Sequence, residues 1–149
     1  MEHDYLERSY FSVSRAIYIL CNRFDNIALP IRHSVHYDIL AEKDFNIYRI
    51  KVISTKSKTA SGNYIANLRK SGGYSKTNTQ KAPFDKKSCD YVYVITPDHE
   101  YLIPSHEVKN SRALSMGSWN NYILRDSSAE EQRPVKPLVE GSIPSRADF

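Results

Sequence analysis

One carboxylate and one lysine stand at a spacing that could support cleavage of a phosphodiester. Asp38 lies between Tyr37 and Ile39 in one short apolar stretch, and Lys51 comes thirteen residues later in another. Phosphodiester hydrolysis commonly uses carboxylate oxygens to hold Mg²⁺ and a cation beside the scissile phosphate. If the two stretches are neighbouring strands, positions 51 and 53 project from one face beside Asp38. The spacing makes Asp38 a candidate metal ligand and Lys51 a candidate phosphate-binding cation.

The hydropathy pattern predicts the elements that would position these residues. Residues 2–24 carry apolar side chains at three- and four-residue steps, which predicts an amphipathic helix. Its apolar face comprises Leu6, Tyr10, Val13, Ile17, Leu20 or Cys21, and Phe24. Strands are predicted at residues 27–29, 36–42, 46–54, 63–68, 91–96, 101–103 and 119–124, and Ser105 is predicted to cap a brief helix that includes residues 107–109. This order predicts an α/β fold of α+β character, with a mixed β-sheet core and an N-terminal helix packed on it.

Length and composition predict a single soluble domain. We assign residues 1–125 to this domain and residues 126–149 to a polar C-terminal tail with three prolines. No apolar run approaches the roughly 20 residues that a membrane helix needs, and the acidic N-terminus lacks a secretory apolar segment. We therefore expect a cytoplasmic location without membrane contact. Cys21 and Cys89 have no metal-binding spacing, and we expect both to be buried, reduced thiols.

Positive charge is concentrated between Lys51 and Lys87, a stretch that we call the cationic segment. It contains nine lysines and arginines and one acid, Asp85, so its net charge is +8, whereas the rest of the chain sums to −4. Such a segment is typical of a protein that binds a polyanion, although a solvated lysine-rich surface is the alternative. The candidate DNA contacts are Lys56, Lys58, Arg69, Lys70, Tyr74, Lys76, Lys81, Lys86 and Lys87.

The order of several short motifs resembles the PD-(D/E)XK nuclease superfamily, in its branch of small intron-encoded homing endonucleases from cyanobacteria. The resemblance covers about two thirds of the chain, from about Glu7 to about Val108. Its pieces are a helix glutamate (Glu7), Tyr37-Asp38-Ile39, the stretch 48–54 against the family's Tyr-Arg-Ile-Gln-Val-Lys-Thr, the stretch 64–68, and Asp90 through Pro104. Each piece is short, and their order and spacing carry the resemblance.

The resemblance implies a site that departs from the family pattern at two positions. Asp38 and Glu7 would be ligands of Mg²⁺ or another divalent cation, and Lys51 stands where the family has a metal-ligating Gln or Glu. Ile53 stands where the family has its catalytic lysine. An isoleucine cannot contact phosphate through a charge, and a lysine beside Asp38 weakens divalent-ion binding. These two departures have three interpretations. Lys51 could be a migrated catalytic lysine that reaches the phosphate from the neighbouring position, the chain could be a degenerate DNA-binding protein, or it could be a variant altered to block cutting.

The candidate residues also have ordinary structural explanations. Asp38 could be an ordinary strand-end carboxylate, and Asp90 could cap a strand or pair with a lysine. Glu7 could stabilise a helix N-terminus, and Lys51 could be a cation on an exposed strand face. His33 and His36 would point to opposite faces of one strand, which argues against zinc.

The function that these observations imply is site-specific binding and Mg²⁺-dependent cleavage of double-stranded DNA by a homodimer or homotetramer, without a small-molecule cofactor. The alternatives are a catalytically inactive, sequence-specific DNA-binding protein and a structure-selective, junction-resolving nuclease.

Overall fold

The computed structural model describes residues 2–32, 36–68, 84–110 and 112–124, with side chains from Tyr10 onward. The described elements are α1 (Glu2–Leu20), β1 (Asn26–Ala28), β2 (Ile39–Lys43), β3 (Asn46–Ser54), β4 (Ile65–Asn67), β5 (Tyr91–Ile95), β6 (Glu100–Pro104) and β7 (Ala113–Ser115). Three short 3-10 helices follow β6 and β7, at Ser105–Glu107, Met116–Ser118 and Asn120–Tyr122. The residues assigned to the C-terminal tail lie outside the described part of the chain.

The main sheet has the strand order β1-β2-β3-β5-β6. Strands β1, β2 and β3 form an antiparallel meander, β3 pairs with β5 in parallel, and β6 returns antiparallel to β5. The sheet is therefore mixed, as the sequence predicts. Strands β4 and β7 form a second, two-stranded antiparallel sheet. The parallel pairing of β3 with β5 requires a crossover, and β4 lies in that connection.

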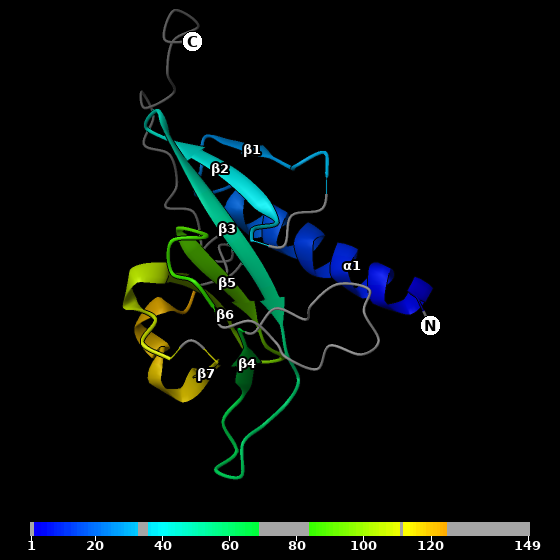
Figure 1. Ribbon diagram of the computed structural model, residues 1–149, viewed down its shortest axis with the longest axis vertical. Helices are drawn as coiled ribbons and strands as arrows, with labels where there is room; N and C mark the ends of the chain where they lie inside the picture. Colours follow the sequence, from blue (N-terminus) through cyan, green and yellow to red (C-terminus); the bar gives the residue numbers. More distant parts are fainter. Residues whose placement is uncertain (1, 33–35, 69–83, 111, 125–149) are drawn as a thin grey trace, which may run out of the picture.

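The main sheet is covered on both faces. On one face Ala16 and Leu20 of α1 pack with Ile39, Ile50 and Tyr93. On the other face the alternate residues of β5 and β6 pack with residues of β4, β7 and the 3-10 helices: Ala66, Val92, Val94, Ile103, Leu114 and Met116. We call this second group of buried residues the lower cluster. Figure 1 shows α1 on one side of β3 and the β4–β7 region on the other. This arrangement puts consecutive residues of β3 into two different environments.

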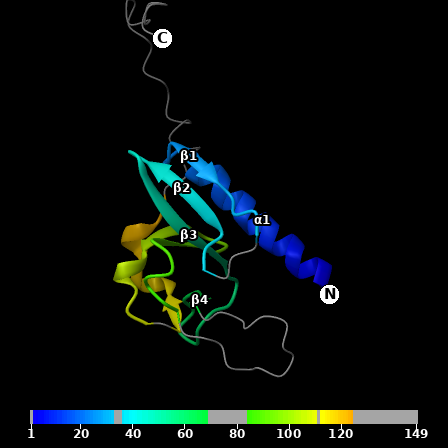
Figure 2. The ribbon, with the colours of Figure 1, turned by 45° about the horizontal axis from the view of Figure 1, so that its top comes forward.

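The N-terminal helix is shorter and less completely packed than its apolar periodicity predicts. It ends at Leu20, and residues 21–23 form a turn before β1. Figure 2 shows the first half of α1 extending past the sheet, and Tyr10 is accordingly 71% exposed. Ala16 and Ile19, which the predicted face omits, are buried instead. No helix in the described part of the chain is long and apolar enough to cross a membrane.

Three further sequence predictions are corrected by the structure. Cys21 is exposed, whereas Cys89 is buried as predicted, and both are free thiols. The predicted brief helix is a single 3-10 turn whose N-cap is Pro104, so Ser105 is its first residue rather than its cap, and the Ser105 hydroxyl lies 3.3 Å from Sγ of Cys89. Residues 119–124 contain a 3-10 helix and one β-bridge, between Ile123 and Tyr101, rather than a strand.

Candidate functional site

Asp38 lies directly before β2 and is tied to β3 by its backbone and its side chain. The register that pairs Ile39 with Ile50 places Asp38 opposite Lys51. The Asp38 N–H donates to the carbonyl oxygen of Ile50 at 2.9 Å. The Val52 N–H donates to Asp38 Oδ2 at 2.8 Å, so this carboxylate takes the place of a backbone carbonyl where β2 begins. Asp38 thus has the structural role of a strand-end carboxylate, and it also lies next to Lys51.

Lys51 forms an ion pair with the same carboxylate oxygen. Its Nζ lies 3.4 Å from Asp38 Oδ2. Only 11% of the Asp38 side chain and 25% of the Lys51 side chain are exposed, so bulk water screens the pair incompletely. The Oδ2 atom therefore already has two positive or partly positive partners. A divalent ion bound through Oδ2 would have to share that oxygen with an ammonium group, which repels it.

Ile53 has an apolar environment on the same face of β3 as Lys51. The parallel register places Lys51 beside Val92 and Ile53 beside Val94, both on the face that carries the lower cluster. Ile53 is half-buried and packs against that cluster. The position at which the resemblance expects a catalytic lysine therefore contributes to the core on this face.

Asp38 is expected to matter for stability as well as for chemistry. Asp38→Ala would leave the Val52 N–H and the Lys51 ammonium without their shared acceptor, which should cost about 1–3 kcal/mol of unfolding free energy. Asp38→Asn keeps an amide oxygen that can accept from Val52, so most of that stability should be retained. Urea unfolding of the two variants measures the difference. Equal losses in both would contradict the capping role of the carboxylate.

The described residues do not fit a divalent ion while Lys51 contacts Asp38. No group of three or more His, Cys, Asp and Glu side chains that could hold a metal ion occurs in the described part of the chain. Glu7 lies in α1, but its side chain precedes the first one that the structure describes. Its expected approach to Asp38 thus stays a prediction.

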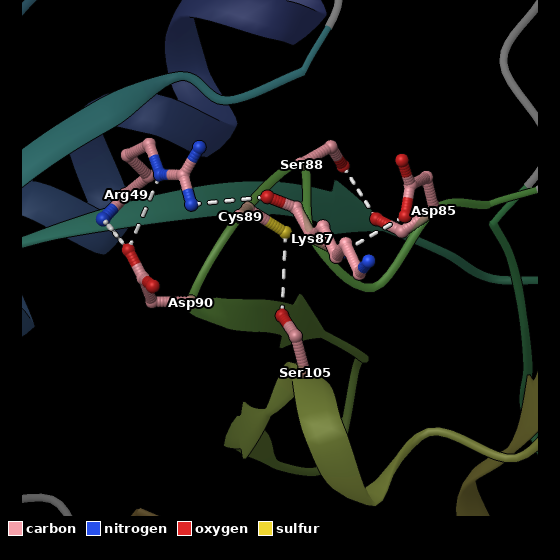
Figure 3. A network of polar contacts seen from close by, with 7 residues as sticks. All are labelled: Arg49, Asp85, Lys87, Ser88, Cys89, Asp90 and Ser105. Carbon is pink, nitrogen blue, oxygen red and sulfur yellow. Dashed lines mark hydrogen bonds and ion pairs between the residues drawn. The ribbon is translucent and has the colours of Figure 1, made fainter.

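A second acid, Asp90, organises the start of β5 (Figure 3). Its Oδ2 accepts from the Arg49 N–H at 2.7 Å and lies 3.4 Å from Arg49 Nε. The Arg49 Nη2 atom also donates to the carbonyl oxygen of Lys87 at 3.0 Å. Burial raises the pKa of the neighbouring Cys89 thiol, which favours its protonated, unreactive form. These contacts hold β5 against β3, and Asp90 has the structural role of a strand cap.

The predicted DNA-contacting residues fall into two groups. Lys56, Lys58, Lys86 and Lys87 are exposed. Arg69, Lys70, Tyr74, Lys76 and Lys81 lie outside the described residues, so their placement stays a prediction. Lys58 has a defined position, because its Nζ lies 4.8 Å from the centroid of the Tyr64 ring. His36 is exposed, and His33 lies outside the described residues.

The sequence analysis missed the hairpin that lies between β3 and β4. The chain between β3 and β4 folds back on itself, and Lys58 and Tyr64 form an isolated antiparallel bridge. Gly62 has a φ of 86°, in the left-handed region that favours glycine, at the turn of this segment. The Ser61-Gly62 pair is a turn signal that could have indicated this hairpin.

Comparison with known proteins agrees with this architecture. The structure of the bacterial homing endonuclease I-Ssp6803I superposes with a TM-score of 0.56 over 85% of this chain and 79% of that chain, at 15% sequence identity. This likeness shows a shared fold, the restriction-endonuclease-like fold with a mixed β-sheet and one N-terminal helix packed on it.

A curated relative and a family were also found. The mRNA export factor MEX67 of Saccharomyces cerevisiae (strain ATCC 204508 / S288c) is 30% identical over 94 residues, which are 62% of this chain and 15% of that protein. The chain thus spans only a small part of the length of this relative. Residues 10–118 match the model of the PD-(D/E)XK endonuclease family, which is more than half of the chain. The chain belongs to the PD-(D/E)XK endonuclease family.

Proposed function

We propose that this protein binds a specific site in double-stranded DNA, in the manner of a homing endonuclease, and cleaves it slowly in the presence of Mg²⁺. Family membership supports an endonuclease with a DNA substrate. The contact of 3.4 Å between Lys51 Nζ and Asp38 Oδ2 supports slow cleavage, because the ammonium group competes with a divalent ion for the Asp38 carboxylate.

The proposed roles of Asp38 and Lys51 rest on this contact, and the proposed role of Glu7 rests on the resemblance to the family alone. Asp38 is the proposed metal ligand, with Glu7 as a supporting carboxylate. Lys51 is close enough to Asp38 to contact the phosphate of a DNA strand lying at the site, so it is the proposed phosphate-binding cation. Ile53 cannot replace the family's lysine, because its side chain has no polar atom and packs against the lower cluster. We therefore expect this chain to bind DNA but to cleave it only slowly.

The proposed DNA-binding surface is the cationic segment. Its exposed members Lys56 and Lys58 follow β3 directly, and Lys86 and Lys87 precede β5, the parallel neighbour of β3. Lysines on such a surface contact phosphates and position the protein without reading sequence. A domain of this size covers a short stretch of duplex, so we propose a homodimer or homotetramer with two-fold symmetry.

The second candidate is a sequence-specific DNA-binding protein that does not cleave. The packing of Ile53 against the lower cluster favours this candidate, because Ile53 stands where the resemblance expects the catalytic lysine. The two candidates share the same binding surface and differ only in turnover.

One experiment separates the two candidates. The full chain is incubated with supercoiled plasmid carrying a preferred duplex site, with Mg²⁺ or with a chelator, and binding and nicking are followed in parallel. We expect binding in both conditions and slow nicking only with Mg²⁺. Asp38→Asn should stop the nicking and leave binding nearly unchanged, or slightly tighter because a negative charge is removed. If the unmodified chain binds but does not nick at any Mg²⁺ concentration, the second candidate is selected. If the unmodified chain neither binds nor nicks DNA, the proposal is rejected.

A further inference from the structure

A two-stranded ribbon extends from the main sheet between β3 and β4. It comprises residues 55–65, and Figure 1 shows this segment projecting beyond the end of β3 before it returns to β4. The Ile65 N–H donates to the Ser57 carbonyl oxygen at 2.9 Å, and the Thr59 N–H donates to the Asn63 carbonyl oxygen at 2.8 Å. These bonds cross between the two halves of the segment. We refer to residues 55–65 as the ribbon.

The tip of the ribbon is ordered by its own polar groups. The Gly62 N–H donates to the Thr59 carbonyl oxygen at 2.9 Å, which closes the turn. The hydroxyl oxygens of Thr59 and Ser61 lie 2.8 Å apart, and the Thr59 hydroxyl also donates to the Asn63 carbonyl oxygen at 3.3 Å. The backbone on either side of Asn63 is therefore fixed before any ligand binds.

The side chain of Asn63 is exposed but held in place. A Cβ at Gly117 would lie 2.8 Å from Asn63 Oδ1 and 2.9 Å from Nδ2, so the absence of a side chain at Gly117 makes room for the amide. The Met116 N–H donates to the Tyr64 carbonyl oxygen at 2.9 Å and ties the ribbon to the same 3-10 helix. Among the described residues, the Asn63 amide has no hydrogen-bond partner. Its donor and its acceptor are thus both available on a positioned, exposed side chain.

We propose that the ribbon enters the major groove of DNA and that Asn63 reads an adenine there. This inference rests on the proposed function as a DNA-binding protein. The major groove admits a two-stranded β-ribbon, and an asparagine amide can bond both N6 and N7 of adenine. Lys56 and Lys58 are exposed on the ribbon, and the position of Lys58 over Tyr64 keeps one of these cations at its side, where it can contact phosphate.

The ribbon follows directly after β3, the strand that carries Lys51. Lys51 is four residues before Thr55, where the ribbon begins. At the rise of a β-strand these four residues span about 13 Å. The base-reading element and the proposed phosphate-binding lysine therefore belong to one continuous stretch of chain, and both can contact the same duplex.

The test uses the full chain and a library of random duplexes from which the preferred site is selected. Asn63→Ala should lose, by about tenfold, the preference for adenine at one position of the selected site, while its salt dependence stays that of the unmodified chain. The matched control is Asn46→Ala, which removes an exposed asparagine at the other end of β3 and should leave every preference unchanged. Retained preference in Asn63→Ala would overturn the inference.

A second variant tests the positioning of the amide. Gly117→Ala introduces a Cβ that displaces the Asn63 side chain, so it should weaken the same adenine preference. Added to Asn63→Ala, it should have no further effect, because the amide is already absent. If Gly117→Ala weakens the adenine preference equally in the unmodified chain and in Asn63→Ala, Gly117 does not act by positioning the Asn63 amide. If Gly117→Ala does not fold, Asn63→Ala decides the inference alone. Failure of the unmodified chain to bind any duplex would instead reject the proposed function.

Discussion

Replacing Lys51 by Gln and Ile53 by Lys together is expected to raise Mg²⁺-dependent cleavage by well over tenfold. The first change removes the ammonium group that lies 3.4 Å from Asp38 Oδ2 and supplies an amide oxygen instead. The second puts a cation on the same face of β3. A positioned cation at a transferring phosphate lowers the barrier by several kcal/mol, and about 1.4 kcal/mol corresponds to tenfold in rate. Single-turnover cleavage of a plasmid carrying the selected site measures the gain.

Stability has to be measured on the same variants. Ile53 is half-buried against the lower cluster, so Ile53→Lys should lower the free energy of unfolding by about 1–3 kcal/mol. Rates are therefore compared at a temperature where circular dichroism shows every variant folded. Adding Asp38→Asn to the double variant should abolish the new activity. An unchanged rate in the folded double variant, or activity that survives Asp38→Asn, would show that cleavage does not depend on these residues.

Raising the salt concentration from 50 to 200 mM is expected to weaken DNA binding by about 250- to 1,000-fold. The cationic segment carries nine lysines and arginines against one acid. If about five of them contact phosphates, counterion release gives a slope of log K against log salt of about −4 to −5. Fluorescence anisotropy on a labelled duplex measures this slope. A slope shallower than about −1 would exclude the cationic segment as the binding surface.

Two pairs of lysines provide the control for this result. Neutralising Lys86 and Lys87 together should make the slope about two units shallower and weaken binding to all duplexes alike, because phosphate contacts carry no sequence information. Neutralising Lys43 and Lys109, which are exposed but lie outside the cationic segment, should change the slope little. Similar changes for both pairs would indicate a response to net charge rather than to a defined surface.

Much of the sheet could be predicted from local sequence. The predicted third strand has the bounds of β3. Tyr48, Ile50 and Val52 alternate with Arg49 and Lys51, and this period of two is typical of a strand whose two faces have different environments. The same alternation predicts that positions 51 and 53 share a face. The short strand β7 was missed, because its three residues, Ala113–Ser115, give too little periodicity to be distinguished from a loop.

The features that the sequence did not predict depend on contacts between distant residues. The helix prediction placed Tyr10 on the packed face, but the sheet does not extend far enough to cover it, and periodicity contains no information on that length. Asn63 and Gly117 are 54 residues apart in the chain, so their contact has no local signature. By contrast, the proximity of Lys51 to Asp38 was predicted, and the strand register that the turn at Asp44 and Phe45 determines brings Lys51 Nζ to 3.4 Å from Asp38 Oδ2.

Calorimetric titration with Mn²⁺ tests the role of Lys51 most directly, because it needs no DNA and no turnover. Because the Lys51 ammonium group competes for Asp38, the unmodified chain without DNA should bind Mn²⁺ too weakly for saturation at millimolar concentration. Lys51→Gln should then bind one ion per chain, and adding Asp38→Asn should remove that binding. Saturable binding of Mn²⁺ by the unmodified chain, lost in Asp38→Asn and unaltered in Lys51→Gln, would contradict the account, because Lys51 would then not compete with a metal ion for Asp38.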